Sequence, residues 1–173
     1  MTGNNNVIFL GPKARLNNCT ISIHANNCIF HIEGKSTIIK NTFFSIHENN
    51  GKIIIGNSFT MEGGRISSCE GAAITIGDDC MFSGDINIMS GDYHSIISLK
   101  NNERINKASG ISIDNHVWLA AHVCVLKGSH IPSHSVIGNS SLVTHDLKDT
   151  NCLYSGIPAK KIKENITWSR ERI

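Results

Sequence analysis

The stretch IDNHVWLAAHVCVLKGSHIPSHSVIGNSSLVT, residues 113–144, repeats a pattern every six residues. Each sixth residue is aliphatic: Ile113, Leu119, Val125, Ile131, Ile137 and Val143. The residue four positions after each of the first five is small: Val117, Val123, Ser129, Ser135 and Ser141. An amphipathic helix would space its apolar residues by three and four, and a hairpin strand by two. A period of six instead predicts a short strand followed by a tight corner, repeated along the chain.

These hexads predict a prism with three walls. Each aliphatic residue points inward, and the small residue near the bend also turns in, where a larger side chain would crowd the axis. Three sides close one coil of about 18 residues, and successive coils stack as parallel strands about 4.8 Å apart. Only this stacking buries the inner face. The expected fold class is therefore all-β, a parallel β-helix.

Weaker hexads occur upstream in other registers. The residues that carry them are Ile32, Ile38 and Phe44 in one run, Ile55, Phe59 and Met61 in a second, and Ile76, Phe82 and Ile88 in a third. The register slips near 45–54, 62–75 and 89–112, which predicts corner loops or insertions there. Together the hexads predict about five to seven coils, with the first ones less regular.

The chain length fits one domain, residues 1–173. Its expected parts are irregular N-terminal coils over 1–60, regular coils over 74–90 and 111–148, and a C-terminal arm over 154–173. The polar run from Gly91 to Gly110 is longer than a simple connection, and such protruding loops are usually functional. The tail after Lys160 predicts a short helix or arm over the open end, because a stacked array needs a cap.

The composition agrees with this fold. Forty per cent of the residues are hydrophobic, enough for a core, which excludes a disordered chain. The apolar set contains 27 Ile against 8 Leu, and isoleucine favours strands. The chain also contains 19 Asn and 15 Gly, which favour turns and left-handed backbone. A helix bundle is therefore not expected.

The charge balance and the apolar runs limit the possible partners. The net charge is +2 at pH 7, so no strong field favours nucleic acid or an anionic membrane. The apolar run over residues 7–10 is far shorter than the about 20 residues that span a bilayer, and the N-terminus lacks the features of a signal peptide. None of the six cysteines forms a CxxC pair, and reduced thiols are expected without export. We expect a soluble, cytoplasmic protein.

Three segments outside the simple repeat carry further information. They are Ser-Gly-Asp-Tyr-His-Ser-Ile at 90–96, Asn-His-Val-Trp-Leu-Ala at 115–120 and Tyr-Ser-Gly-Ile-Pro-Ala-Lys-Lys-Ile at 154–162. With the hexads, they resemble the hexapeptide-repeat acyltransferases, the left-handed β-helix family, in the branch of sugar and capsular polysaccharide O-acetyltransferases. The resemblance implies left-handed coils, an acetyl-CoA donor, a carbohydrate acceptor and a homotrimer with active sites between subunits.

Acetyl transfer to a hydroxyl needs a base, a positioned thioester and a donor for the oxyanion. His94 is the candidate base, because a histidine on a polar loop can titrate near neutral pH while reaching a sugar. The resemblance implies that it deprotonates the acceptor, which attacks the thioester directly. Trp118 breaks the polar exterior, and the resemblance implies that it walls the thioester channel or donates its N–H. Asp92 could orient His94 from two residues away. The structural alternatives are a solvated loop histidine for His94, an aromatic packed under the loop or at a subunit interface for Trp118, and a solvated turn carboxylate for Asp92.

The resemblance also implies contacts to coenzyme A. The residues concerned are Ala120, Ala121, Asn139, Thr144, His145, Lys160 and Lys163. The two alanines would meet the pantetheine amides through their backbone, and the two lysines would meet the phosphates as point charges. His145 departs from the family pattern, in which a basic side chain usually follows the threonine. Lys161 is an alternative to either lysine, and a solvated surface is the structural alternative for all three.

Two other functions stay open. His116, His122 and His134 share one hexad position, and the first and last are one coil apart on the same face. This stacking would allow a zinc site similar to that of the γ-class carbonic anhydrases, although the spacing differs from their His-x4-His pair. A polar exterior face is the structural alternative, and no metal is expected. The other alternative is a catalytically inert β-helix scaffold. Cys28 and Cys80 occupy small inward positions and are expected in the core.

Overall fold

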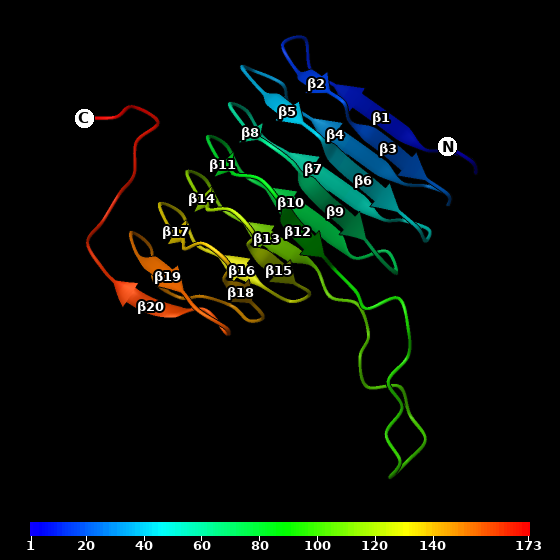
Figure 1. Ribbon diagram of the computed structural model, residues 1–173. Coiled ribbons are helices and arrows are strands. Elements are labelled where there is room, and N and C mark those ends of the chain that lie inside the picture. The colour runs from blue at the N-terminus through cyan, green and yellow to red at the C-terminus, as the bar shows by residue number, and fades with distance from the viewer.

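The computed structural model describes all 173 residues as twenty strands and no helix. As far as β18, consecutive strands enter three sheets in turn and form the left-handed β-helix of about six turns in Figure 1, and β19 and β20 then join the second sheet. The first sheet contains β1 (Val7–Leu10), β4 (Ile29–Ile32), β7 (Lys52–Ile55), β10 (Ala73–Ile76), β13 (Ile111–Ile113) and β16 (His130–Ile131). The second contains β2 (Arg15–Asn17), β5 (Ile38–Lys40), β8 (Thr60–Met61), β11 (Met81–Phe82), β14 (Trp118–Leu119), β17 (Val136–Ile137), β19 (Leu153–Ser155) and β20 (Lys160–Lys163). The third contains β3 (Thr20–Ile23), β6 (Thr42–Ile46), β9 (Gly64–Ser68), β12 (Ile86–Met89), β15 (Cys124–Leu126) and β18 (Leu142–Val143).

The predicted hexads form the core, which confirms the fold class. The six aliphatic residues from Ile113 to Val143 are at most 2% exposed. The small residues also turn inward and are buried, namely Val117, Val123, Ser129, Ser135 and Ser141. Cys28 and Cys80 are fully buried, as expected, and burial raises the pKa of the Cys80 thiol to about 12. No helix in the structure could cross a membrane.

Left-handed backbone at the corners explains the abundance of asparagine. Corner residues with positive φ include Asn5, Asn18, Asn27, Asn41, Asn50 and Asn151, and asparagine tolerates this region better than most residues. Corner side chains also link successive coils. Asn115 Oδ1 accepts a hydrogen bond from the Asp78 backbone N–H (2.8 Å), and Asp78 Oδ1 accepts one from the Asn57 N–H (2.6 Å). These bonds satisfy amides that the parallel ladders leave free.

The early coils are longer than the hexads predict. Ile55 pairs with Ile76 in the first sheet, so this coil takes 21 residues, whereas the hexads predict about 18. The inward position on β5 is also one residue later than predicted, because Ile39 is fully buried and Ile38 only half-buried. Longer strands, such as the five residues of β6 and of β9, shift the register without breaking the coil.

Only one of the three stretches with a slipped register leaves the solenoid. The corner loops predicted within 45–54 and 62–75 are confirmed only at 47–51 and 69–72, because β7 begins in the first stretch and β9 lies in the second. The third stretch, between β12 and β13, forms a long loop that projects from the side of the solenoid (Figure 1), as predicted. Ile97 and Arg104 form an antiparallel bridge between its two limbs.

The C-terminal segment is an extended arm rather than a helix. β20 pairs antiparallel with β19 on the last coil, and the chain then runs back along the flank of the second sheet (Figure 1). Arg170 fixes the arm there. Its Nε donates to Asp79 Oδ1 (3.1 Å), and its Nη2 donates to the carbonyls of Ser58 (2.9 Å) and Cys80 (3.0 Å). A short helix without a packed face is marginal in water, whereas the arm gains these contacts.

Candidate active site

A groove runs between the flank of the second sheet and the arm. Its volume is about 470 Å³, and most of its lining side chains are apolar. β14 and the corner after it contribute Trp118 and Ala120, the corner after β17 contributes Asn139, and the arm contributes Lys163 and Trp168. A concave, mainly apolar site with a few polar groups is typical of small-molecule binding.

Trp168 forms the outer wall of this groove. Its ring stacks on the His116 ring, with centroids 4.3 Å apart and planes 11° apart, and its Nε1 donates to the His116 carbonyl (2.8 Å). His116 Nδ1 lies 2.6 Å from Asp79 Oδ2. Burial opposes the ionisation of Asp79, but hydrogen bonds from His116 and Arg170 outweigh it and lower the pKa of this carboxyl. The ionised Asp79 therefore helps hold the arm in place. The arm brings the Trp168 ring to the groove, where its centroid lies 6.3 Å from that of the Trp118 ring.

Trp118 contributes an unpaired hydrogen-bond donor to the site. Strand alternation explains its outward direction, because its neighbour Leu119 is fully buried in the core. The Trp118 indole is half-buried, and its Nε1 is shielded from solvent and has no acceptor. Leaving a buried donor unsatisfied costs about 1–3 kcal/mol, and such groups are rare. A ligand oxygen in the groove would satisfy this N–H.

The backbone after β14 has one free amide. The Ala120 N–H donates to the Ile137 carbonyl (2.9 Å), so the solenoid itself uses it. The Ala121 N–H has no such acceptor, while the Ala121 carbonyl accepts from the Ser140 N–H (2.9 Å). Of the two predicted amides, only the Ala121 N–H is therefore free for a ligand, while Ala120 lines the groove.

His94 lies at the foot of the projecting loop, and its side chain is exposed. Asn106, only 6% exposed, holds its backbone: Nδ2 donates to the His94 carbonyl (2.7 Å) and to Asp92 Oδ2 (2.8 Å). Lys127, from the end of β15, donates to Asp92 Oδ2 and to the Asn106 carbonyl (3.1 Å). The bonds from Lys127 and then Asn106 lower the pKa of Asp92. The Asp92 carboxylate thus anchors the loop and does not contact the His94 ring.

The groove gathers four of the predicted residues, namely Trp118, Ala120, Asn139 and Lys163. Thr144 and His145 are exposed at the corner after β18, where Thr144 Oγ1 lies 3.4 Å from His145 Nδ1. Lys160 is exposed at the start of β20. His94 is not in the groove, because its loop leaves from the third sheet, whereas the groove lies on the second. One chain therefore does not bring His94 and Trp118 together.

The three lysines of β20 differ in their partners. Lys161 is paired with Asp149 (3.0 Å) and Glu164 (3.2 Å). Lys160 and Lys163 are exposed, and Lys163 lines the groove. Lys163 and Lys160 are therefore better placed than Lys161 to meet a ligand phosphate.

Sequence reasoning missed three residues around the site. Trp168 was assigned no role, although an indole in an otherwise polar tail is a signal that it packs on something. Asn106 and Lys127 carry no comparable signal, because polar residues in a loop and at a corner are ordinary. Their contacts appear only when the loop folds back onto β15.

The histidines at one hexad position do stack, as predicted. The ring centroids of His116 and His134 lie 5.1 Å apart. His122 instead lies 3.5 Å from Asp85, and His116 is engaged by Asp79 and the arm. No three His, Cys, Asp or Glu side chains come together as a metal-binding group. The contacts of His116 therefore assign it to fixing the arm.

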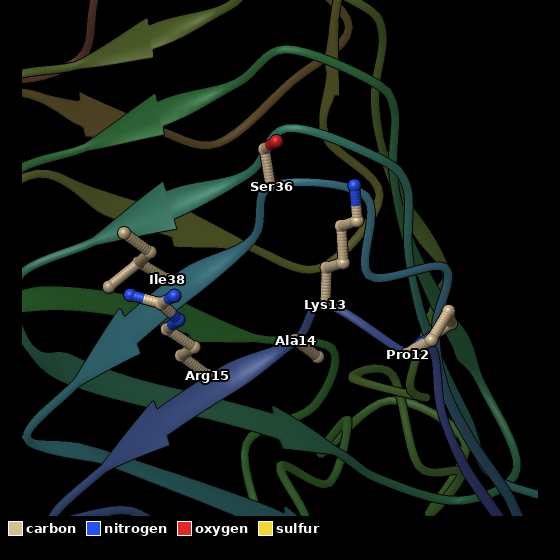
Figure 2. A pocket seen from close by; sticks show the side chains of 6 residues that line it. All are labelled: Pro12, Lys13, Ala14, Arg15, Ser36 and Ile38. Carbon is tan, nitrogen blue, oxygen red and sulfur yellow. The ribbon is translucent and has the colours of Figure 1, made fainter.

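A second cavity lies at the N-terminal end of the second sheet. Figure 2 shows its lining residues, Pro12, Lys13, Ala14, Arg15, Ser36 and Ile38, around a volume of about 530 Å³. It opens beside β2 and β5, and β8 and β11 separate these strands from β14. The cavity contains none of the predicted site residues.

Known proteins resemble the chain along nearly its whole length. It is 36% identical over 171 residues to the polysialic acid O-acetyltransferase of Neisseria meningitidis, which covers 98% of this chain and 78% of that protein. It is 26% identical over 165 residues to the galactoside O-acetyltransferase of Escherichia coli (strain K12), which covers 88% of this chain and 80% of that protein. The crystal structure of the polysialic acid O-acetyltransferase OatWY matches with a TM-score of 0.77 at 30% identity, over 100% of this chain and 93% of that one. No protein-family model matches the chain.

The fold and the comparisons lead to the same family. The hexads form a left-handed solenoid. The loop after β12 projects from its side, and β19 and β20 lie at its end. The similarity to the relatives extends over the full solenoid. The chain is therefore an acyltransferase of the hexapeptide-repeat family, and it belongs to the branch of sugar and capsular polysaccharide O-acetyltransferases.

Proposed function

We propose that this protein transfers the acetyl group of acetyl-CoA to a hydroxyl of a surface polysaccharide or of its sugar precursor. The observation that carries the proposal is the unpaired Trp118 Nε1 beside an apolar groove. Relatives named for polysialic acid favour an acidic sugar as acceptor. The proposed donor, acetyl-CoA, is made in the cytoplasm, which favours acetyl transfer by this protein in the cytoplasm.

The groove fits the long, mainly apolar arm of coenzyme A. The free Ala121 N–H and the exposed Asn139 side chain would hydrogen-bond its amides, and Lys163 and Lys160 would meet its phosphates. Thr144 and His145 lie at the corner after β18 and would contact it only if it extends past the last coil. When bound, acetyl-CoA supplies an activated thioester.

A neighbouring subunit would complete the site. The loop that carries His94 exposes several apolar side chains: Ile96 (56%), Ile97 (44%), Leu99 (103%) and Ile105 (65%). Such a patch favours contact with another protein surface. In a homotrimer, the loop of one subunit would place His94 over the Trp118 groove of the next, which a single chain does not achieve.

The roles of the residues follow from this arrangement. His94 would accept the proton of the acceptor hydroxyl as its oxygen attacks the thioester carbon, and Trp118 Nε1 would donate to the carbonyl oxygen on which charge develops. As the C–S bond breaks, His94 would pass the proton to the departing sulfur, and coenzyme A would leave as the free thiol. No cysteine lines the groove. The Cys80 thiol lies in the core, where burial raises its pKa to about 12 and keeps it protonated. Direct attack without an acyl-enzyme therefore fits the residues present.

The test is a complementation between two inactive variants. The variants His94→Ala and Trp118→Ala are co-expressed with different tags. They should form mixed oligomers in which some sites combine an intact loop with an intact groove. Random assembly of a cyclic oligomer restores about one site in four, so activity should return to about a quarter of that of the native enzyme. Acetyl transfer is read as free thiol release. Mixed oligomers as inactive as either variant alone would contradict a site shared between subunits.

Trp168→Ala is expected to weaken coenzyme A binding about fivefold, because losing the aromatic wall costs about 1 kcal/mol. Calorimetric titration with coenzyme A measures the effect. Trp168→Phe keeps the wall but loses the bond to the His116 carbonyl, so its Kd should rise less than that of the alanine variant. Because Trp168 is not part of the core cluster, the unfolding midpoint of the solenoid should change little. An unchanged Kd for Trp168→Ala would contradict the placement of the donor in this groove.

A further inference from the structure

The outer face of the third sheet holds an arginine clamped between aromatic rings. The Arg65 guanidinium carbon lies 5.3 Å from the Phe43 ring centroid and 5.9 Å from that of Tyr93. Arg65 Nε donates to Ser67 Oγ (3.0 Å), and Ser67 is fixed in turn by a hydrogen bond to Ser45 (2.8 Å). Stacking and this bond set the orientation of the guanidinium.

Arg65 has no protein carboxylate as a partner. Arg104 and Arg170 are paired with Glu70 and Asp79, whereas the only hydrogen bond of the Arg65 side chain is the one from Nε. Its two terminal nitrogens therefore remain free. A guanidinium fork of this kind matches a carboxylate with two parallel hydrogen bonds.

A second unpaired polar atom lies in the same cluster of side chains, which consists of Arg65, Phe43, Tyr93 and His47. The His47 ring packs edge-on against Tyr93, with centroids 5.2 Å apart and planes at 88°. His47 Nε2 is shielded from solvent and has no hydrogen-bond partner. Buried polar atoms normally have partners, so both His47 and Arg65 favour a polar ligand at this place.

The cluster adjoins the candidate base. Tyr93 immediately precedes His94, and both lie at the foot of the projecting loop. The groove for the donor lies on a different sheet and has its own cation, Lys163. An anion bound at Arg65 would therefore belong to the acceptor, whose hydroxyl must reach His94.

We propose that Arg65 binds the carboxylate of an acidic sugar acceptor, with Phe43, Tyr93 and His47 forming the surrounding surface, so that a hydroxyl of this sugar is presented to His94. This assignment rests on the proposed function and makes Arg65 a residue that determines acceptor specificity. It requires no new chemical step, because Arg65 only holds the substrate.

The experiment compares Arg65→Met and Arg65→Lys with the native enzyme, using an oligomer of sialic acid and its carboxyl methyl ester as acceptors and acetyl-CoA as donor. Arg65→Met should raise KM for the acid about 10- to 100-fold, because a charge-assisted bond is worth about 1.5–3 kcal/mol. Arg65→Lys should recover part of this loss. The ester should be a poor acceptor for the native enzyme and should lose little further in Arg65→Met.

Arg15→Met is the matched control, because Arg15 is another exposed arginine, on β2 at the far end of the solenoid. It should leave KM for both acceptors unchanged. Equal losses for acid and ester, a changed Kd for coenzyme A, or dissociation of the oligomer in Arg65→Met would each overturn the role of Arg65. The proposed function would still hold after any of these three results, provided that the native enzyme acetylates the acidic acceptor and the His94→Ala variant does not. A native enzyme that acetylates no acidic sugar would overturn both.

Discussion

His94→Ala is expected to lower kcat for acetyl transfer about 100- to 10,000-fold, the usual contribution of a positioned general base. The loop should keep its structure, because Asn106 holds the His94 backbone carbonyl and not the ring. The Kd for coenzyme A should stay the same, since the donor groove belongs to other residues. Thiol release gives the rate, and calorimetric titration gives the Kd.

His24→Ala serves as the control for this variant. His24 is also exposed, but it lies after β3 in the first coil, and the one hydrogen bond of its side chain is to Thr2 (3.1 Å). Its loss should leave both kcat and Kd unchanged. Full activity in His94→Ala would remove this histidine from the mechanism, and a loss of coenzyme A binding would assign it to the donor site instead.

Trp118→Phe is expected to lower kcat about 100- to 1,000-fold, as when one donor to an oxyanion is removed. Phenylalanine keeps an aromatic wall in the groove, so the Kd for coenzyme A should change little. The unfolding midpoint should not fall, because the lost N–H is buried without a partner and its removal relieves a desolvation cost.

This combination of readouts separates two roles of the indole. A lower kcat with undiminished stability identifies the N–H as a donor in the reaction. Native activity in Trp118→Phe would show that the indole only shapes the groove. Lower stability and lower activity together would indicate that Nε1 has a structural partner in the assembled oligomer, and would also contradict the proposed role.

Much of the solenoid could be predicted from the sequence because its rules are local. The period of six fixes which residues of 113–143 point inward, and these residues do form the core. Trp118, Asn139 and Lys163 could likewise be assigned to one groove by resemblance. The early coils were less predictable, since strands of varied length moved the inward position from Ile38 to Ile39.

The sequence by itself therefore determined the stacked coils, the projecting loop and the family, because short-range periodicity decides how each strand and corner is built. Only the tertiary structure decided how the edges of the site are closed. Trp168 meets His116 across 52 residues of sequence and Arg170 meets Asp79 across 91, while Lys127 meets Asp92 across 35. Such contacts join side chains whose separation along the chain follows no period, so no local sequence pattern predicts them. They form only once the coils have stacked and brought these positions together.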